Sequence, residues 1–182
     1  MWHWSVPAFL LFLAGSHATF VPWKPLRPGD EPAKGPLVLF WIPASHDDFR
    51  RSELLSSDEL ARYATHCVGL LVVRPEDEEM LERLEVEGVP AAVLLDGEGN
   101  EVDRVDAVEG ALKTSSVEEM VREALDDRAA AAEAMLDDAR TKAGAGEMEA
   151  AVDLYRTVKE QRCMCPRQAK EAQRALKKLG RR

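Results

Sequence analysis

The one local chemical signal in the sequence is a pair of cysteines near its C-terminus. Cys163 and Cys165 flank Met164, which places two thiols and a thioether side by side. Such a group can bind a soft metal, form a strained ring disulfide or exchange with another disulfide. Three interpretations stay open for so short a motif: a structural disulfide or partner crosslink, inert thiols, and metal or redox chemistry.

The third cysteine leaves an odd thiol. Cys67 directly precedes an apolar run from Val68 to Val73, which predicts a buried strand. Free cysteine is among the most frequently buried residue types. We therefore expect Cys67 to be a core residue, and any working pair of thiols to be formed by Cys163 and Cys165.

The consecutive residues Ser45, His46 and Asp47 contain the residue types of a hydrolytic triad. The base of a triad must reach the nucleophile and be oriented through its other nitrogen, which adjacent positions rarely allow. Ser45 with Asp48 three residues later instead matches a helix N-cap, and both carboxylates favour the positive end of a helix dipole. We therefore expect capping here, and no hydrolysis.

Ser45 lies between a predicted strand, over 37–42, and a predicted helix, over 47–64. The run from Leu37 to Ile42 is apolar without alternation, as in a strand covered on both faces, and Pro43 ends it. An apolar stripe predicts a helix after it, over 47–64, which Ser57 can restart. The further predictions are a strand over 68–73, a helix over 76–86, a hairpin of 91–95 with 101–105, and a helix over 117–143 opened by a capping box of Ser116 and Glu119.

From Phe40 to Arg50 the chain reads FWIPASHDDFR, which resembles the thioredoxin active-site segment: an aromatic pair, a proline, then Cys-x-x-Cys and a basic residue. The run from Gly88 to Val102 is similar to the family's Gly-Val-(cis-Pro) strand and the hairpin that follows it. The resemblance covers residues 36 to 125. It implies an α/β thioredoxin-like fold, a central mixed sheet flanked by helices, with a cis peptide bond before Pro90.

The resemblance also implies that the family's chemistry is missing. Ser45 and Asp48 occupy the places of the two cysteines, and Leu39 sits where many thioredoxins keep a buried carboxylate. Without two thiols there is no dithiol to exchange. We therefore expect no catalytic residue here and a binding module in place of an enzyme. The alternative is a thiol-disulfide oxidoreductase whose working cysteines are Cys163 and Cys165.

A peptide-binding surface does not depend on the missing cysteines. In the thioredoxin family, the strand after the cis-proline pairs with the backbone of a substrate, and this geometry does not require sulfur. We expect the surface near Trp41, Ser45, Val89 and Pro90 to hold an extended peptide or a partner protein. The sequence leaves the oligomeric state open.

The chain divides into a leader, a linker, a domain and an extension. Residues 1–18 resemble a secretory signal, which predicts an exported, periplasmic or extracellular protein, or one anchored to a membrane through an uncleaved 1–18. Residues 19–35 are rich in proline and form either an extended spacer or an arm over the sheet. The thioredoxin-like domain is predicted over 36–127 and the helical extension over 128–182.

The extension is predicted to continue the helix over 117–143 and to add helices over 147–161 and 167–179. Within it, small and aromatic residues match the turn and packing positions of a single tetratricopeptide-like unit: Ala139, Gly146, Ala151 and Tyr155. That resemblance implies a partner-binding or dimerising arm. The other interpretation is a helical hairpin that only caps the domain, because one unit does not make a repeat array.

The charge and the missing motifs narrow the function further. A net charge of -9 argues against nucleic acid and anionic membrane surfaces as partners. The sequence contains no phosphate loop, dinucleotide fingerprint or metal-ligand cluster of histidines and carboxylates. We therefore expect no cofactor and no metal site, and proteins or peptides as partners.

Overall fold

The computed structural model describes residues 20–27, 29–30 and 35–180. The expected signal segment, residues 1–18, lies outside these residues, as do several positions of the Pro-rich segment. Within the described part of the chain, no helix combines the length and the apolar character needed to cross a membrane.

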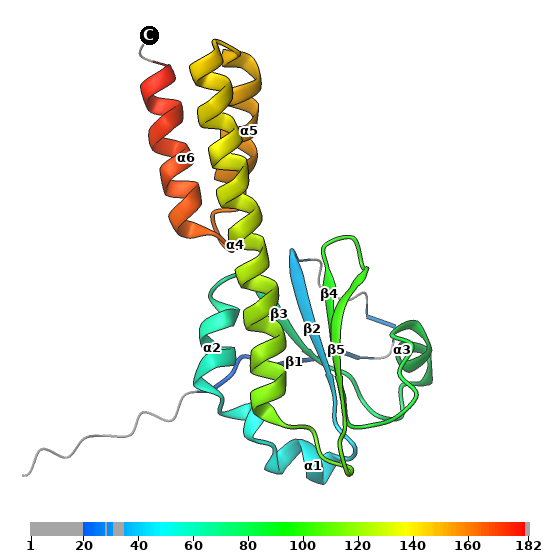
Figure 1. The fold of residues 1–182 in the computed structure, drawn as a ribbon. Helices are drawn as coiled ribbons and strands as arrows, with labels where there is room; N and C mark the ends of the chain where they lie inside the picture. Colours follow the sequence, from blue (N-terminus) through cyan, green and yellow to red (C-terminus); the bar gives the residue numbers. More distant parts are fainter. Residues whose placement is uncertain (1–19, 28, 31–34, 181–182) are drawn as a thin grey trace, which may run out of the picture.

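A mixed sheet of five strands forms the centre of the fold, in the order β1-β3-β2-β4-β5 (Figure 1). The first three strands run parallel to one another, whereas β4 is antiparallel to both β2 and β5. The predicted fold class, a thioredoxin-like sheet flanked by helices with a C-terminal helical extension, is confirmed. The strands are β1 (Lys24–Pro25), β2 (Leu37–Ile42), β3 (Val68–Val72), β4 (Ala91–Asp96) and β5 (Glu101–Asp106).

Helices cover both faces of the sheet, which explains why β2 has no polar residue. One face packs against α2 (Asp58–Ala64) and α4 (Thr114–Ala145), and the other against α3 (Glu78–Arg83). Side chains of successive residues on a strand point to opposite faces, so every position of β2 is buried. The odd-numbered residues of β2 face α2 and α4; they are Leu37, Leu39 and Trp41. The even-numbered residues face α3; they are Val38, Phe40 and Ile42.

The helix predicted over 47–64 is divided into three pieces. They are α1 (His46–Arg51), a 3-10 turn (Glu53–Leu55) and α2. Ser57 restarts the helix as expected, because its Oγ accepts a hydrogen bond from the Leu60 amide at 3.0 Å. The same hydroxyl donates to Glu118 at 2.6 Å and so ties α2 to α4.

The prediction that Ser116 caps α4 is wrong. The helix begins three residues earlier than predicted, at Thr114, with Lys113 at the N-cap position and no side-chain cap. Val117, Met120 and Val121 lie on its sheet-facing side, so the apolar stripe and not the cap places this helix.

The segment before residue 36 takes part in the sheet. Lys24 and Pro25 pair with β3 along its free edge, and the Leu26 amide donates to the Val72 carbonyl at 2.8 Å. Trp23 packs into the core, where its Nε1–H donates to the Leu54 carbonyl at 2.8 Å. Residues 20–27 therefore form an arm along the sheet, the second of the two arrangements that the sequence allows, and the ordered domain starts before residue 36.

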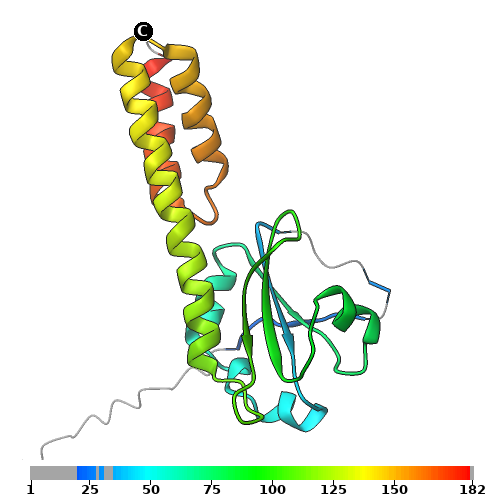
Figure 2. The same cartoon turned by 45° about the vertical axis from the view of Figure 1, so that its right-hand side comes forward.

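The helical extension grows out of the domain through one long helix. The 32 residues of α4 pack on the sheet in their first half and then continue beyond it (Figures 1 and 2). Gly146, with a φ of 86°, ends α4 in the left-handed conformation that glycine adopts most easily. Then α5 (Met148–Glu160) and α6 (Pro166–Leu179) fold back along it, around a separate core that includes Leu136, Ala139, Ala151 and Tyr155.

Candidate functional site

The sheet brings the two segments of the predicted site to the same end of two neighbouring strands, β2 and β4. In the antiparallel pairing of β2 with β4, Ile42 lies opposite Ala91 as the last pair of the ladder. The next residues outward are therefore Pro43 on one strand and Pro90 on the other. The peptide bond between Val89 and Pro90 is cis, as the resemblance implied.

Ser45 is the N-cap of α1 and lies just beyond this end of the strands. Its hydroxyl oxygen accepts the capping hydrogen bond. The Ser45 Oγ accepts a hydrogen bond from the Asp48 amide at 3.1 Å, and Asp48 Oδ2 accepts one from the Ala44 amide at 2.9 Å. The predicted cap is confirmed. The Ser45 and Asp48 side chains thus hold the first turn of the helix. Neither a hydroxyl nor a carboxylate can take part in thiol–disulfide exchange.

Substitution of Ser45 tests this capping role. We expect Ser45→Ala to lower the free energy of unfolding by about 1 kcal/mol, because the Asp48 amide loses its partner. Ser45→Asn, which keeps a capping oxygen, should stay within about 0.5 kcal/mol of the natural chain. Urea denaturation followed by circular dichroism gives both values, and equal losses for the two variants would contradict the capping role.

Trp41 does not belong to the exposed surface where the sequence analysis placed it. Its side chain is only 1% exposed and packs between two other aromatic rings. The ring centroids of Trp23 and Phe49 both lie 5.3 Å from that of Trp41. Trp41 is therefore a core residue that supports α1 through its contact with Phe49. The prediction that Trp41 contacts a bound peptide is wrong.

Val89 remains at the surface and borders a shallow acidic hollow. Its side chain is 37% exposed, whereas the neighbouring Pro90 is buried. The hollow has a volume of about 800 Å³. Its charged lining in the described part of the chain consists of four carboxylates and one cation, namely Glu85, Glu87, Glu101, Asp106 and Arg104.

Arg104 fixes the chain that leads to Val89. Its guanidinium donates to the backbone carbonyls of Glu85 at 2.9 Å and Leu84 at 3.1 Å, and it pairs with Glu101 on the same strand. The hydrogen bonds from Arg104 lower the pKa of the Glu101 carboxyl below its ordinary value. Glu101 and Arg104 therefore form a nearly neutral ion pair, and the negative charge of the hollow comes from Glu85, Glu87 and Asp106.

The cysteines are paired differently from the sequence prediction. Cys67 forms a disulfide with Cys163 across 96 residues, and Cys165 is the free thiol. The expectation of a buried Cys67 is wrong: this residue is exposed, in the turn between α2 and β3. The alternative redox pair of Cys163 and Cys165 is likewise not the pair that forms.

The disulfide also lies far from the predicted site. Cys67 precedes Val68, which pairs with Leu37 at the start of β2, whereas Ser45 and Pro90 lie beyond the end of that strand. Six residues of extended strand span about 20 Å. The disulfide therefore joins the domain to the loop between α5 and α6, at the opposite end of the sheet from Ser45 and the start of α1.

Cys165 is a buried thiol with little reactivity expected. Its residue is 1% exposed in the core of the extension. Burial raises the pKa of the Cys165 thiol, and Arg128 opposes the shift only in part. Because the thiolate is the reactive form, a raised pKa and a covered sulfur both slow modification.

Alkylation therefore separates the cysteines. At pH 8, iodoacetamide should label Cys165 at least ten times more slowly in the folded chain than after denaturation, as read by mass spectrometry. Cys67 and Cys163 should take up label only after reduction. Rapid labelling of Cys165 in the unreduced, folded chain would contradict this assignment.

Comparison with known proteins adds only a distant likeness. No family model and no curated protein matches the chain. Among solved structures, it is similar to a DsbH oxidoreductase, with 19% sequence identity, a TM-score of 0.36, and coverage of 48% of this chain and 74% of that one. It is also similar to a thioredoxin from Thermus thermophilus, with 21% identity, a TM-score of 0.36, and coverage of 48% and 72%. Likenesses this weak carry no argument about what the chain does.

Proposed function

We propose that this chain is an exported, redox-inactive binding module that holds an extended peptide or a partner protein around Ser45 and Val89, where β2 ends and β4 begins, with the buried Pro90 shaping this surface from beneath. One observation carries the proposal. The register of β2 with β4 places Pro90 beside the start of α1, with Val89 exposed next to it, while Ser45 and Asp48 are committed to capping. The surface therefore offers contacts without offering a reactive group.

The charge of this surface favours one class of peptide. The hollow beside Val89 is lined mainly by carboxylates, and Arg104 is already paired with Glu101. An extended peptide with one or more basic residues gains electrostatic attraction here, whereas an acidic one is repelled. Main-chain pairing of an extended peptide with the residues that precede β4 would supply affinity that depends little on side-chain identity.

The cysteines support export as part of the proposal. A disulfide between distant segments persists in oxidising compartments and is rare where thiols are kept reduced. The Cys67–Cys163 disulfide thus agrees with the secretory signal expected in residues 1–18. The helical extension, with its likeness to a tetratricopeptide unit, would provide a second contact for a partner protein.

Binding of short unstructured peptides tests the site. We expect a fluorescein-labelled basic peptide to bind in an anisotropy titration, and an acidic peptide of the same length to bind at least five times more weakly. Val89→Arg should lower the affinity for the basic peptide at least fivefold. The matched control is Val102→Arg, another exposed valine, at the hairpin end of the sheet.

Two results would reject this site. One is equal binding of the acidic and basic peptides, because the carboxylates of the hollow would then have no influence. The other is an equal loss of binding in Val89→Arg and Val102→Arg, because the effect would then follow the added charge and not the position.

A further inference from the structure

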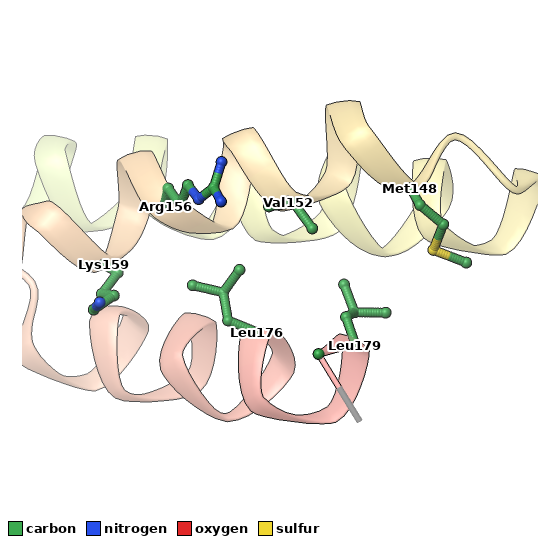
Figure 3. Close-up of a pocket in the computed structure, with 7 residues that line it drawn as sticks. Met148, Val152, Arg156, Lys159, Leu176 and Leu179 are labelled. Carbon is green, nitrogen blue, oxygen red and sulfur yellow. The ribbon is translucent and has the colours of Figure 1, made fainter. Parts of the chain in front are cut away.

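The helical extension carries an apolar groove that the proposed peptide site does not use. It runs between α5 and α6 and has a volume of about 610 Å³. Figure 3 shows the side chains of Val152, Leu176 and Leu179 directed into the space between the two helices, with Met148 at one end and Lys159 at the other. Met148 is 40% exposed, so this apolar surface is open to solvent.

The groove has a cationic end. Among the residues that the structure describes, Arg156 and Lys159 are the only charged residues of its lining, and both come from the C-terminal half of α5. Arg156 is paired with Asp153 on its own helix, whereas Lys159 makes no ion pair with any residue that the structure describes. The groove thus offers an unpaired ammonium group beside an apolar floor.

The neighbouring helix strengthens this positive character, although the chain as a whole is acidic. Only one carboxylate, Glu171, stands on α6, and it is already paired with Arg140 of α4. The basic residues of α6 are Arg167, Lys170, Arg174, Lys177 and Lys178. Arg167 is paired with Glu133 of α4, and α5 itself carries the carboxylates Glu149, Asp153 and Glu160. The positive charge that a partner meets beside the groove therefore comes from Lys159 and from the other basic residues of α6.

We propose that this groove binds an acidic amphipathic helix of a partner protein. The lining residues of α5 recur at positions 148, 152, 156 and 159, which follow one face of the helix over about 17 Å. A third helix of about three turns fits along such a pair by the usual packing of side-chain ridges into grooves. Apolar residues on one face of that helix would cover Val152 and Leu176, and flanking carboxylates would pair with Lys159 and Arg156.

The other occupants fit this surface less well. A second copy of the chain would bring two strongly basic α6 helices close together, which costs electrostatic repulsion. A small molecule would stay largely exposed, because only two helices line the groove and binding pockets normally enclose most of their ligand. An extended basic peptide, which suits the surface around Ser45 and Val89, would be repelled by Lys159.

A pair of designed peptides tests the proposal on the full chain. The first is a 14-residue amphipathic helix with leucines on one face and glutamates on the other, and the second has lysine in place of every glutamate. In a fluorescence anisotropy titration we expect the acidic peptide to bind at least ten times more tightly than the basic one. Because the attraction is partly ionic, raising the salt from 50 to 500 mM should weaken it at least threefold.

Substitutions locate the binding. We expect Val152→Asp, and separately the charge reversal Arg156→Glu/Lys159→Glu, to lower the affinity for the acidic peptide at least tenfold. Circular dichroism should show that both variants stay folded. Arg122→Glu on the exposed side of α4 is the matched control and should bind as the natural chain does. Val89→Arg should also leave this binding unchanged, which separates the groove from the surface around Ser45 and Val89.

Three outcomes would overturn the proposal. The first is tighter or equal binding of the basic peptide. The second is acidic binding that the groove variants leave intact. The third is a concentration-dependent dimer in sedimentation that Val152→Asp abolishes, which would assign the groove to a second copy of this chain.

Discussion

Removal of the disulfide by Cys67→Ala/Cys163→Ala is expected to lower the free energy of unfolding by about 2–4 kcal/mol. The bond closes a loop of 96 residues, and a loop of this length restricts the unfolded chain strongly. It also holds the α5–α6 loop to the turn before β3, so its loss frees the extension from that end of the sheet. Both effects act in the same direction.

Guanidinium denaturation under oxidising and reducing conditions measures this effect. The double variant should show the same stability with and without reductant, and the natural chain should fall to its level on reduction. The matched control, Cys165→Ala, keeps the disulfide and should lose the same amount on reduction as the natural chain. A natural chain whose stability does not respond to reductant would show that the bond does not form or does not stabilise.

Truncation of the central tryptophan is expected to cost about 3–5 kcal/mol. Trp41 is 1% exposed, and Trp41→Ala removes the ring that joins Trp23 of the N-terminal arm to Phe49 of α1. The surrounding backbone belongs to the central strand of the sheet and cannot collapse into the space. Dispersion contacts and buried apolar area are therefore lost without compensation.

The comparison with an exposed residue makes this test specific. Val89→Ala should change the free energy of unfolding by less than about 0.5 kcal/mol, as surface substitutions usually do. Urea denaturation gives both values. A small loss for Trp41→Ala would mean that this side chain is not the core residue we describe, and would restore it as a candidate for the binding surface.

Local patterns in the sequence predict most of the fold. The unbroken apolar run of β2, the proline that ends it and the Ser45 cap each depend on neighbouring residues, and each is confirmed. Gly146 likewise lies between the two helices predicted over 117–143 and 147–161, and α4 ends there. These features follow from short-range chemistry, which a sequence displays directly.

Features that depend on distant contacts are the ones that the sequence analysis missed. The partner of Cys163 lies 96 residues away, and the pairing becomes visible only when the extension is known to fold back along α4. Trp41 is a surface residue or a core residue according to whether Trp23 covers it, and the Pro-rich composition around Trp23 conceals an edge strand. Composition alone does not distinguish a spacer from an arm that packs.

The most direct test of the central claim is an insulin-reduction assay on the purified chain with dithiothreitol as the reductant. Ser45→Cys/Asp48→Cys, which places two thiols at the start of α1, serves as the positive control. We predict that the natural chain reduces insulin no faster than dithiothreitol alone and that the control reduces it faster. Turnover by the natural chain that disappears in Cys163→Ser/Cys165→Ser would contradict it, because the protein would then be an oxidoreductase.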